Sequence, residues 1–316
     1  VDNFNNKVSV ATYHTITKEA DGEWAIPATV TSNATTVATG NSAVDTATAP
    51  AAAAGQVNAL TTGLDILTGG SGGDTFTASA STVSAATVQT LNAGDNLSGG
   101  EGADTLNLSN TSGTAAFGTG VTTSSVESIS INGVTATNLD ASLMSGVTSV
   151  TNNGSLAAIS VTGLAAIPSV SVVASNANTT VGMTAAATVG LADEMTINLN
   201  GASTTAASAV SAEGIEKFNV VASGTASGAL TTPVTLTSAR LKDVVITGDA
   251  ASALAANLAG ATTTAAGSVT GNDAANTVIL TAAGTDKISV SLGAGNDVMS
   301  IGTIGATHTI AGGDGT

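Results

Sequence analysis

The 316-residue chain is acidic, with 22 Asp and Glu against 6 Lys and Arg, a formal net charge of -16 and a pI of about 4.1. A surface of that sign repels nucleic acid and anionic membranes and attracts divalent cations. The chain contains no cysteine, so disulfides do not stabilise it, and no apolar run approaches the roughly 20 residues needed to span a bilayer. Only 9% of the residues are charged and the mean hydropathy is +0.36, which argues against intrinsic disorder.

The head of the chain, residues 1–54, is predicted to be the end of a helical domain followed by a linker. Residues 5–18 can place Val8, Val10 or Ala11, and Tyr13 or Ile16 near one face of a helix, and residues 33–47 are a second candidate helix. Pro50, which lies among alanines, marks the linker. Thr and Val are poor helix formers, so the composition gives this helical segment little support.

Two segments match the nonapeptide G-G-x-G-x-D-x-U-x, in which U is a large apolar residue: GGSGGDTFT at residues 69–77 and GGEGADTLN at residues 99–107. Copies of this repeat wind into a calcium-loaded parallel β-roll. The glycines allow a tight turn, the aspartate supplies a hard carboxylate oxygen, and the last three residues form a strand whose U side chain points inward. We therefore expect calcium to be bound by these carboxylates and turn residues: Asp74, Asp104, Gly69, Gly70, Gly72, Gly99, Gly100 and Gly102.

Each complete nonapeptide is preceded in phase by a degenerate copy, which places Asp65 and Asp95 at the sixth position and Leu67 and Leu97 at the eighth. Each block is therefore a pair, and residues 55–112 are predicted to form a calcium-binding β-roll. Asp65 and Asp95 are further candidate calcium ligands. The alternative is that these turns keep their shape without an ion, because the number of ligands controls affinity.

The repeat returns with slippage in residues 269–316, which we interpret as a second calcium nonapeptide block. Asn276 occupies one aspartate position, and Asp286, Gly295 and Asp297 are candidate calcium ligands, with a turn that holds no ion as the alternative at Asp286. The final five residues, GGDGT, open another copy, and Val1 is not methionine, so we expect the 316 residues to be a segment of a longer polypeptide.

Residues 113–268, between the two blocks, are predicted to be a β-solenoid. Short alternating segments rich in β-branched residues indicate strands at residues 128–131, 169–173, 195–199, 218–221, 234–236, 244–247 and 288–292. The segments VESISI, IEKFNV and LKDVVI share an apolar residue and a charged residue before a strand, as the start of a solenoid coil would. The predicted fold is mainly β, a right-handed parallel β-helix or β-roll, and an antiparallel sandwich is the competing architecture.

Catalytic motifs are weak, and we predict that the chain is not an enzyme. His14 and His308 are far apart in the sequence, and no H-E-x-x-H zinc motif is present. Residues 69–73 fit G-x-S-x-G around Ser71, but this stretch is the calcium turn and lacks the strand-turn-helix context of a nucleophile elbow. His308 occupies the aspartate position of a degenerate repeat, and Asp193-Glu194 is interpreted as a solvated acidic loop.

The sequence resembles the RTX-type surface-layer proteins of Gram-negative bacteria and their large secreted relatives. The resemblance rests on GLDILTGGSGGDTFTA, DNLSGGEGADTLNLS, VESISI, IEKFNV and FNNKVSVATYHTIT, of which the nonapeptides are the specific part. It implies an α-helical head before a long β-solenoid, export by a one-step machine that reads a C-terminal signal, and calcium-driven folding and assembly outside the cell.

The resulting functional hypothesis is a structural extracellular protein that forms a calcium-dependent surface layer (S-layer) on a bacterial cell. Its expected partners are further copies of itself and calcium, with cell-surface polysaccharide as a candidate partner of an N-terminal domain. Nucleic acid and membrane insertion are not expected. Two alternatives remain open, the stalk of a large RTX adhesin and the non-catalytic RTX tail of a secreted hydrolase.

Overall fold

The structure is a computed structural model that describes residues 54–83, 86–111, 115–262, 264–281, 287–302 and 308–315. All of these residues belong to the second of two compact units, Ala54–Thr316. The predicted helical head and the candidate ligand Asp286 lie outside the described residues. Within the described ranges the regular elements are strands, and no helix there is long and apolar enough to cross a membrane.

The strands form three sheets. The long sheet contains, in spatial order, β1 (Val57–Ala59), β3 (Thr75–Val83), β6 (Thr105–Asn110), β9 (Ser128–Gly133), β11 (Ser149–Asn153), β13 (Ser169–Val173), β15 (Glu194–Asn200), β17 (Lys217–Ala222), β19 (Asp243–Gly248), β21 (Gly267–Thr270), β23 (Ile288–Ser291) and β25 (Thr309–Ala311), with β4 (Ala86–Gln89) paired to β3. The second sheet contains β7 (Ala115–Phe117), β10 (Thr137–Asp140), β12 (Ile159–Leu164), β14 (Thr179–Met183), β16 (Ser208–Ser211), β18 (Val234–Thr237), β20 (Ser252–Ala256), β22 (Asn276–Leu280) and β24 (Val298–Ile301). The short sheet contains β2 (Ile66–Thr68), β5 (Asn96–Ser98) and β8 (Thr122–Ser124).

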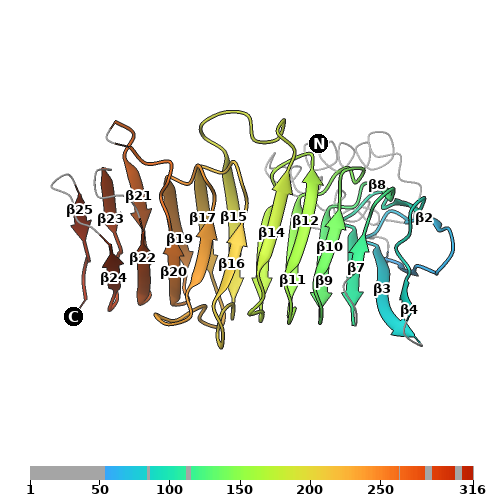
Figure 1. Ribbon diagram of the computed structural model, residues 1–316, viewed down its shortest axis with the longest axis horizontal. Coiled ribbons are helices and arrows are strands. Elements are labelled where there is room, and N and C mark those ends of the chain that lie inside the picture. Colours follow the sequence, from blue (N-terminus) through green and yellow to red (C-terminus); the bar gives the residue numbers. More distant parts are fainter. Residues whose placement is uncertain are drawn as a thin grey trace, which may run out of the picture. The chain divides into compact units, whose positions relative to one another are not determined.

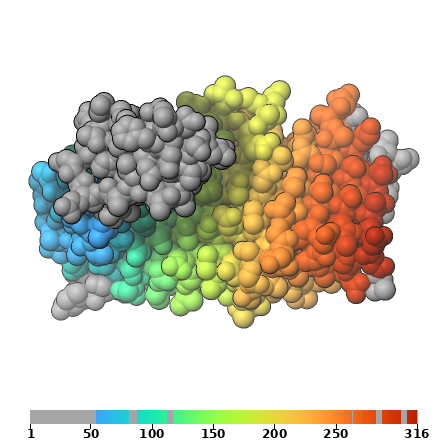
Figure 2. Space-filling model, turned by 180° about the vertical axis from the view of Figure 1, so that it is seen from behind, coloured from blue at the N-terminus to red at the C-terminus, as the bar shows by residue number. Residues whose placement is uncertain are grey.

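Neighbours within a sheet alternate in the sequence, because the chain crosses from one sheet to the other between them. The strand β9 pairs with β11, for example, and β10 pairs with β12, in both cases parallel. The chain therefore winds as a parallel β-solenoid of about nine coils, which follow one another from the blue end to the red end in Figure 1 and, seen from behind, in Figure 2. Hydrogen bonds between coils satisfy the backbone of each internal strand.

The core is a column of apolar side chains between the sheets. In β17, Phe218, Val220 and Ala222 are buried, while the intervening residues are partly exposed. The register stacks Met195, Phe218 and Val244 on one another in three successive coils. Burying a side chain of this size contributes about 1.5–3 kcal/mol, so a stacked column supplies the stability that disulfides do not.

All seven strands predicted in residues 128–292 are present, with bounds that differ by at most two residues at either end. The VESISI, IEKFNV and LKDVVI segments lead into β9, β17 and β19, which all belong to the long sheet. The sandwich alternative is wrong, because β3 and β4 form the only antiparallel pair of named strands in the described chain.

Coil length varies because loops and a hairpin are inserted. The chain advances 18 residues from Gln56 to Asp74, which are neighbours at one corner of the solenoid, and 30 residues from Asp74 to Asp104. The longer step contains the β3–β4 hairpin, which sequence analysis did not predict. Since the hairpin leaves and re-enters the same coil, the two nonapeptide turns still stack directly on each other.

Candidate metal centre at the glycine turns

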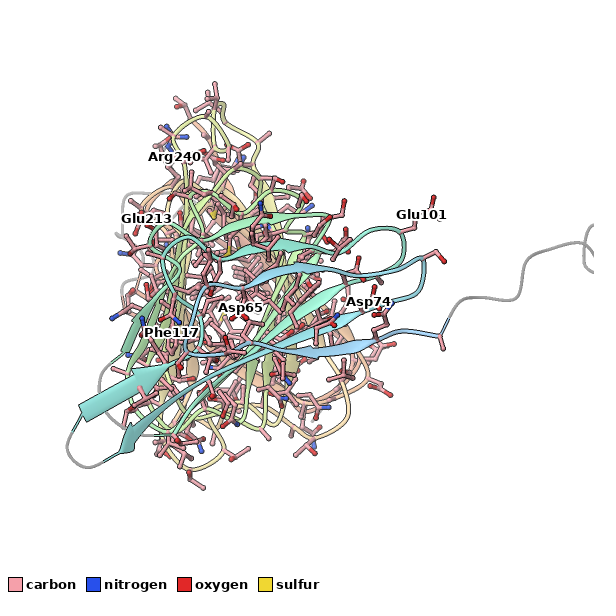
Figure 3. The ribbon with its side chains drawn as sticks, turned by 90° about the vertical axis from the view of Figure 1, so that its right-hand side faces the viewer. Asp65, Asp74, Glu101, Phe117, Glu213 and Arg240 are labelled. Atoms are coloured by element: carbon pink, nitrogen blue, oxygen red, sulfur yellow. The ribbon has the colours of Figure 1, made fainter. Side chains whose placement is uncertain are left out.

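The two complete nonapeptides form turns at one corner of the solenoid, immediately before β3 and β6. Their strands are in register, with Thr75 opposite Thr105. The turn backbones approach so closely that a Cβ on Gly102 would lie 2.6 Å from the Gly72 carbonyl, and Gly102 also has a φ of +116°. Only glycine permits both the backbone conformation and this approach. Glu101, by contrast, is exposed and points away from the corner (Figure 3).

The aspartates of these turns are buried and connected along the corner. Asp74 is 1% exposed, and its Oδ1 and Oδ2 accept the backbone N–H groups of Gln56 and Gly70, both at 2.5 Å. Asp104 is 0% exposed, and its Oδ1 accepts the N–H of Asp74 at 2.6 Å. Asp104 Oδ2 is also buried but has no hydrogen-bond partner. An unpartnered buried carboxylate oxygen is costly unless a cation or a proton compensates it.

The degenerate repeats place Asp65 and Asp95 at a different corner, before β2 and β5. Asp95 Oδ1 accepts the N–H of Asp65 at 2.9 Å, and Asp95 Oδ2 accepts the N–H of Asn92 at 2.7 Å. Both oxygens of Asp65 accept hydrogen bonds from Thr61, one from its backbone and one from its hydroxyl. Every carboxylate oxygen of this pair therefore has a protein donor. This arrangement favours the alternative in which these two turns hold their shape without an ion.

The C-terminal block has a comparable turn around Asp297. Its Oδ1 accepts the N–H of Asn276 at 2.8 Å, while its Oδ2 is shielded from solvent and has no hydrogen-bond partner. Asp297 also lines a cavity of about 170 Å³ together with Gly295, Gly312, Gly313 and Gly315. The predicted ligands Gly295 and Asp297 are thus brought together at one site.

Asn276 occupies the aspartate position of its repeat, but its side chain donates hydrogen bonds to the turn, which an aspartate carboxylate cannot do. Its side-chain amide donates to the carbonyl oxygens of Ala274 at 2.8 Å, Asn272 at 3.2 Å and Leu292 at 3.4 Å. The amide N–H groups therefore hydrogen-bond the carbonyl oxygens around the turn. An asparagine at this position satisfies its turn without a metal.

The residues of the complete repeats fit a calcium ion only when backbone oxygens are included. Among the described residues, no group of three or more His, Cys, Asp or Glu side chains lies close enough together to hold a metal. A Cβ on Gly69 would collide with both Asp74 Oδ2 and the Gly99 carbonyl oxygen, and a Cβ on Gly99 with both Asp104 Oδ2 and the Ser125 carbonyl oxygen. A carboxylate oxygen and a carbonyl oxygen of the next coil thus converge above each glycine, and hard oxygens of these two kinds are calcium ligands.

Among the weak catalytic candidates, Ser71 and His308 are not brought together, and His14 lies outside the described residues. Ser71 is exposed in the turn before β3, and His308 precedes β25 with both ring nitrogens shielded and unpartnered. The interpretation of Asp193-Glu194 as a solvated loop holds only in part: Asp193 ends the loop before β15 and Glu194 is exposed, but Glu194 begins β15 and the N–H of half-buried Asp193 donates to Glu216 at 2.9 Å. Hydrogen bonding to the side chains of Asn219 and Lys217 lowers the pKa of Glu194.

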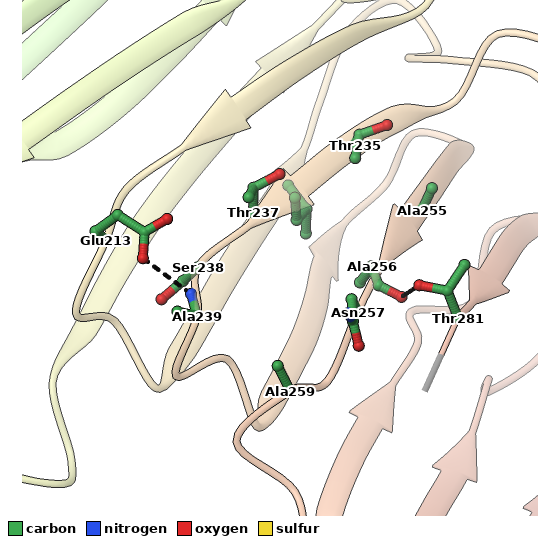
Figure 4. A pocket seen from close by; sticks show the side chains of 11 residues that line it. Glu213, Thr235, Thr237, Ser238, Ala239, Ala255, Ala256, Asn257, Ala259 and Thr281 are labelled. Carbon is green, nitrogen blue, oxygen red and sulfur yellow. Dashed lines mark hydrogen bonds between the residues drawn. The ribbon is translucent and has the colours of Figure 1, made fainter. Parts of the chain in front are cut away.

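A larger cavity of about 470 Å³ lies on the second sheet, beside β18 and β20 (Figure 4). Small side chains line most of it, and Glu213 is its one charged residue among those described. Glu213 Oε2 accepts the N–H of Ala239 at 3.0 Å, so this carboxylate closes a backbone turn. No acid–base or nucleophile pair is present in the described lining.

Sequence analysis missed one acidic residue of the nonapeptide corner, Glu127, whose Oε2 accepts the N–H of Asp104 at 2.8 Å. Glu127 lies in a coil without a nonapeptide, and the available signal was the charged residue at the start of VESISI. No family model matches the chain, and a search of curated proteins found no match.

Proposed function

We propose that this chain is a structural protein of the cell exterior, in which calcium bound at the glycine turns stabilises a β-solenoid that assembles with further copies into a surface layer. The observation that carries the calcium part is Asp104 Oδ2, a fully buried carboxylate oxygen without a donor that converges with a carbonyl oxygen of the next coil on the space beside Gly99. Two neighbouring acceptors repel each other, and a bound cation removes that repulsion.

The residues that would hold calcium are Asp104 and Asp297, each with a carboxylate oxygen that has no donor, and Asp74, with carbonyl oxygens of the stacked turns. Both oxygens of Asp74 accept N–H groups, but Asp74 differs from Asp65 and Asp95 in that a carbonyl oxygen of the next coil converges with it above Gly69. Calcium would supply positive charge to corners in which the described residues place no Lys or Arg beside these three carboxylates. Sites of this kind range in affinity down to the order of 0.1–1 mM in extracellular modules, and the acidic net charge agrees with a calcium-rich exterior. The proposed localisation is therefore the bacterial cell surface.

The assembly part rests on the outward face of the long sheet. From β9 to β13 its side chains are mostly small and polar: Ser128, Ser149 and Ser169 align in successive coils, and the hydroxyls of the first two lie 2.8 Å apart. Further along the sheet, β15, β17 and β19 carry the charged residues Glu194, Lys217 and Asp243 at their starts. Ordering small polar side chains at an interface costs less entropy than ordering Lys or Glu. Because the chain is strongly acidic, contact between copies requires a cation between their charged loops.

A stalk of a large RTX adhesin is the second candidate. The observation in its favour is the continuous parallel ladder from β1 to β25, which a stalk uses to separate a distant binding domain from the cell. The RTX tail of a secreted hydrolase is the third candidate and requires a catalytic domain elsewhere in the polypeptide.

Calcium binding is tested by equilibrium dialysis of the protein after extraction with a chelator. We expect saturable binding in the submillimolar to millimolar range, and Asp104→Asn is expected to lower the number of bound ions. Asp249→Asn is the matched control, because Asp249 is an exposed aspartate in a turn outside the nonapeptides. Absence of bound calcium at several millimolar would overturn the proposal.

Assembly is tested by electron microscopy of cell envelopes and of purified protein. A two-dimensional array that forms with calcium and disperses with chelator supports the surface layer. A protein that stays monomeric in millimolar calcium, or sheets that persist unchanged in excess chelator, would instead favour the adhesin stalk.

A further inference from the structure

The corner formed by the second nonapeptide and the following coil contains two carboxylates from adjacent coils. Asp104 is the last residue before β6, and Glu127 is the last residue before β9, 23 residues later. Glu127 Oε2 accepts the N–H of Asp104, while the N–H groups of Glu127 and Ser128 donate to the carbonyl oxygen of Asp104 at 3.1 and 2.9 Å. Two acidic side chains are thereby fixed beside each other by the backbone.

The same corner recurs at Asp193 and Glu216, outside both nonapeptide blocks. The spacing is again 23 residues, and Glu216 Oε2 accepts the N–H of Asp193 at 2.9 Å. The N–H groups of Glu216 and Lys217 donate to the carbonyl oxygen of Asp193 at 3.0 and 3.1 Å, which reproduces the pattern of the first corner. We call these two arrangements the first and second Asp–Glu corners.

The two corners differ in the cationic side chain that approaches them. Arg240 Nη1 lies 3.3 Å from Glu216 Oε1 at the second corner and also donates to the carbonyl oxygen of Gly190 at 3.0 Å. The residue at the first corner that is equivalent to Arg240 can be found from the backbone hydrogen bonds. The N–H of Lys242 donates to the Glu216 carbonyl oxygen, and the N–H of Thr148 makes the same bond to Glu127. Arg240 lies two residues before Lys242, and the residue two before Thr148 is Gly146, which has no side chain. No ion pair within the described chain includes Asp104 or Glu127.

The first corner also holds an unsatisfied group that points to a ligand. Asp104 is 0% exposed, and its Oδ2 has no donor. This oxygen and the carbonyl oxygen of Ser125 both lie where a Cβ of Gly99 would be. Ser125 has a φ of 50°, a conformation that non-glycine residues rarely adopt and that persists where the surroundings enforce it. Ser125 belongs to the coil of Glu127, so oxygens of two coils meet at one point.

We propose that a calcium ion binds at the first Asp–Glu corner, held by the carboxylates of Asp104 and Glu127 and the carbonyl oxygen of Ser125, and that Arg240 takes the place of this ion at the second corner. The inference rests on the proposed function and completes the calcium site proposed at Asp104, since Glu127 and Ser125 come from a coil without the repeat. This junction joins the calcium-dependent coils to coils whose acidic corner carries its own cation.

The first test counts bound calcium in the full chain and in Glu127→Gln, by equilibrium dialysis at saturating calcium. We expect Glu127→Gln to bind one ion fewer per chain than the unmodified protein. Glu101→Gln is the matched control, because it removes the same charge from the neighbouring turn while its side chain faces solvent (Figure 3). An unmodified protein that binds calcium together with a Glu127→Gln variant that binds the same number would overturn the inference and leave the proposed function intact. An unmodified protein that binds none would overturn both.

The second test removes the cationic side chain that distinguishes the second corner from the first. It does not depend on whether Glu127→Gln folds. Arg240→Gln removes the guanidinium beside Glu216 and leaves Asp193 Oδ2, which is shielded and without a partner, free for an ion. We expect this variant to bind one additional calcium ion and to acquire a melting temperature that calcium raises and chelator lowers. Lys242→Gln is the control, because Lys242 pairs with Asp243 instead. An Arg240→Gln variant whose ion count is unchanged would overturn the assignment of Arg240.

Discussion

At the residue scale, the glycines of the nonapeptide turns determine which atoms of adjacent coils can approach one another. The space beside Gly99 that a side chain would fill is taken by a carboxylate oxygen and a carbonyl oxygen. Glycine therefore does more here than permit a tight turn, because it lets two oxygens of adjacent coils approach one point. Asn276 shows the complementary solution, in which an amide donor satisfies the carbonyl oxygens from within the turn.

Gly99→Ala is expected to destabilise the protein by about 3 kcal/mol or more, because the added Cβ collides with backbone and with a buried carboxylate that cannot move away. Denaturant unfolding measures the change. Gly302→Ala is the control, since a Cβ there has no atom within 4 Å, and we expect an effect within about 1 kcal/mol. Equal effects of the two substitutions would contradict this account of the turn.

Asn276→Asp removes the side-chain amide that donates hydrogen bonds within this turn, and we expect the stability of the variant to depend on calcium. Three carbonyl oxygens lose their amide partner, so the variant should be less stable by about 1–3 kcal/mol in chelator and should recover in millimolar calcium. The melting temperature in the two conditions measures this. Asn257→Asp alters an exposed amide and should respond to calcium no more than the unmodified protein does. Destabilisation of Asn276→Asp that calcium does not reverse would exclude an ion-binding turn at this position.

At the element scale, each strand has an inner face that carries stability and an outer face that is tolerant of substitution. Phe218→Ala in β17 removes a fully buried ring from the stacked column and is expected to cost about 3–5 kcal/mol. Val221→Ala, on the other face of the same strand, should cost less than about 1 kcal/mol because Val221 is only partly buried. Chemical denaturation of both variants measures the difference, and similar losses would be inconsistent with the observed alternation.

The pair between β15 and β17 gives a pH dependence of known sign. Hydrogen bonds from Asn219 and Lys217 lower the pKa of Glu194 below its usual 4.5. A carboxylate with a lowered folded-state pKa stabilises the protein above pH 4.5, and this contribution is lost as the pH falls through the folded-state value. Because Glu194 is half exposed, we expect Glu194→Gln to cost less than about 1 kcal/mol at pH 7, with the difference vanishing in acid. A difference that grows as the pH falls would contradict this sign.

At the scale of the whole molecule, the solenoid combines two ways of holding its corners. Asp104 in the second nonapeptide and Asp297 in the C-terminal block each have a carboxylate oxygen without a partner and no cationic side chain beside them, whereas the central coils contain neutral amides, such as Asn152, or the Arg240–Glu216 pair. In a solenoid each coil contacts mainly its neighbours, so loss of one corner is felt first by adjacent coils.

Chelation is therefore expected to affect the solenoid unevenly. Amide hydrogen exchange should accelerate in residues 55–111 and 287–315 and change much less in residues 128–256, because only the outer coils depend on the proposed ions. Mass spectrometry of peptides from calcium-loaded and chelated protein measures this, and circular dichroism measures the total loss of β-structure. Uniform acceleration along the chain, or no change anywhere, would contradict the division between calcium-dependent and calcium-independent coils.

The sequence by itself determined the class of fold and where the aspartate turns lie, because the nonapeptide spacing and the alternation of apolar residues are local properties of the chain. It indicated the strands around Phe218 and Val244 and the turns before Thr75 and Thr105. Only the tertiary structure decided which coils are neighbours, since loops and the β3–β4 hairpin make the distance between stacked residues vary from 18 to 31 along the chain. For that reason the sequence did not predict that Asp104 pairs with Glu127 or that Glu216 pairs with Arg240. Each pair joins residues of different coils, and the sequence separation between coils is not constant.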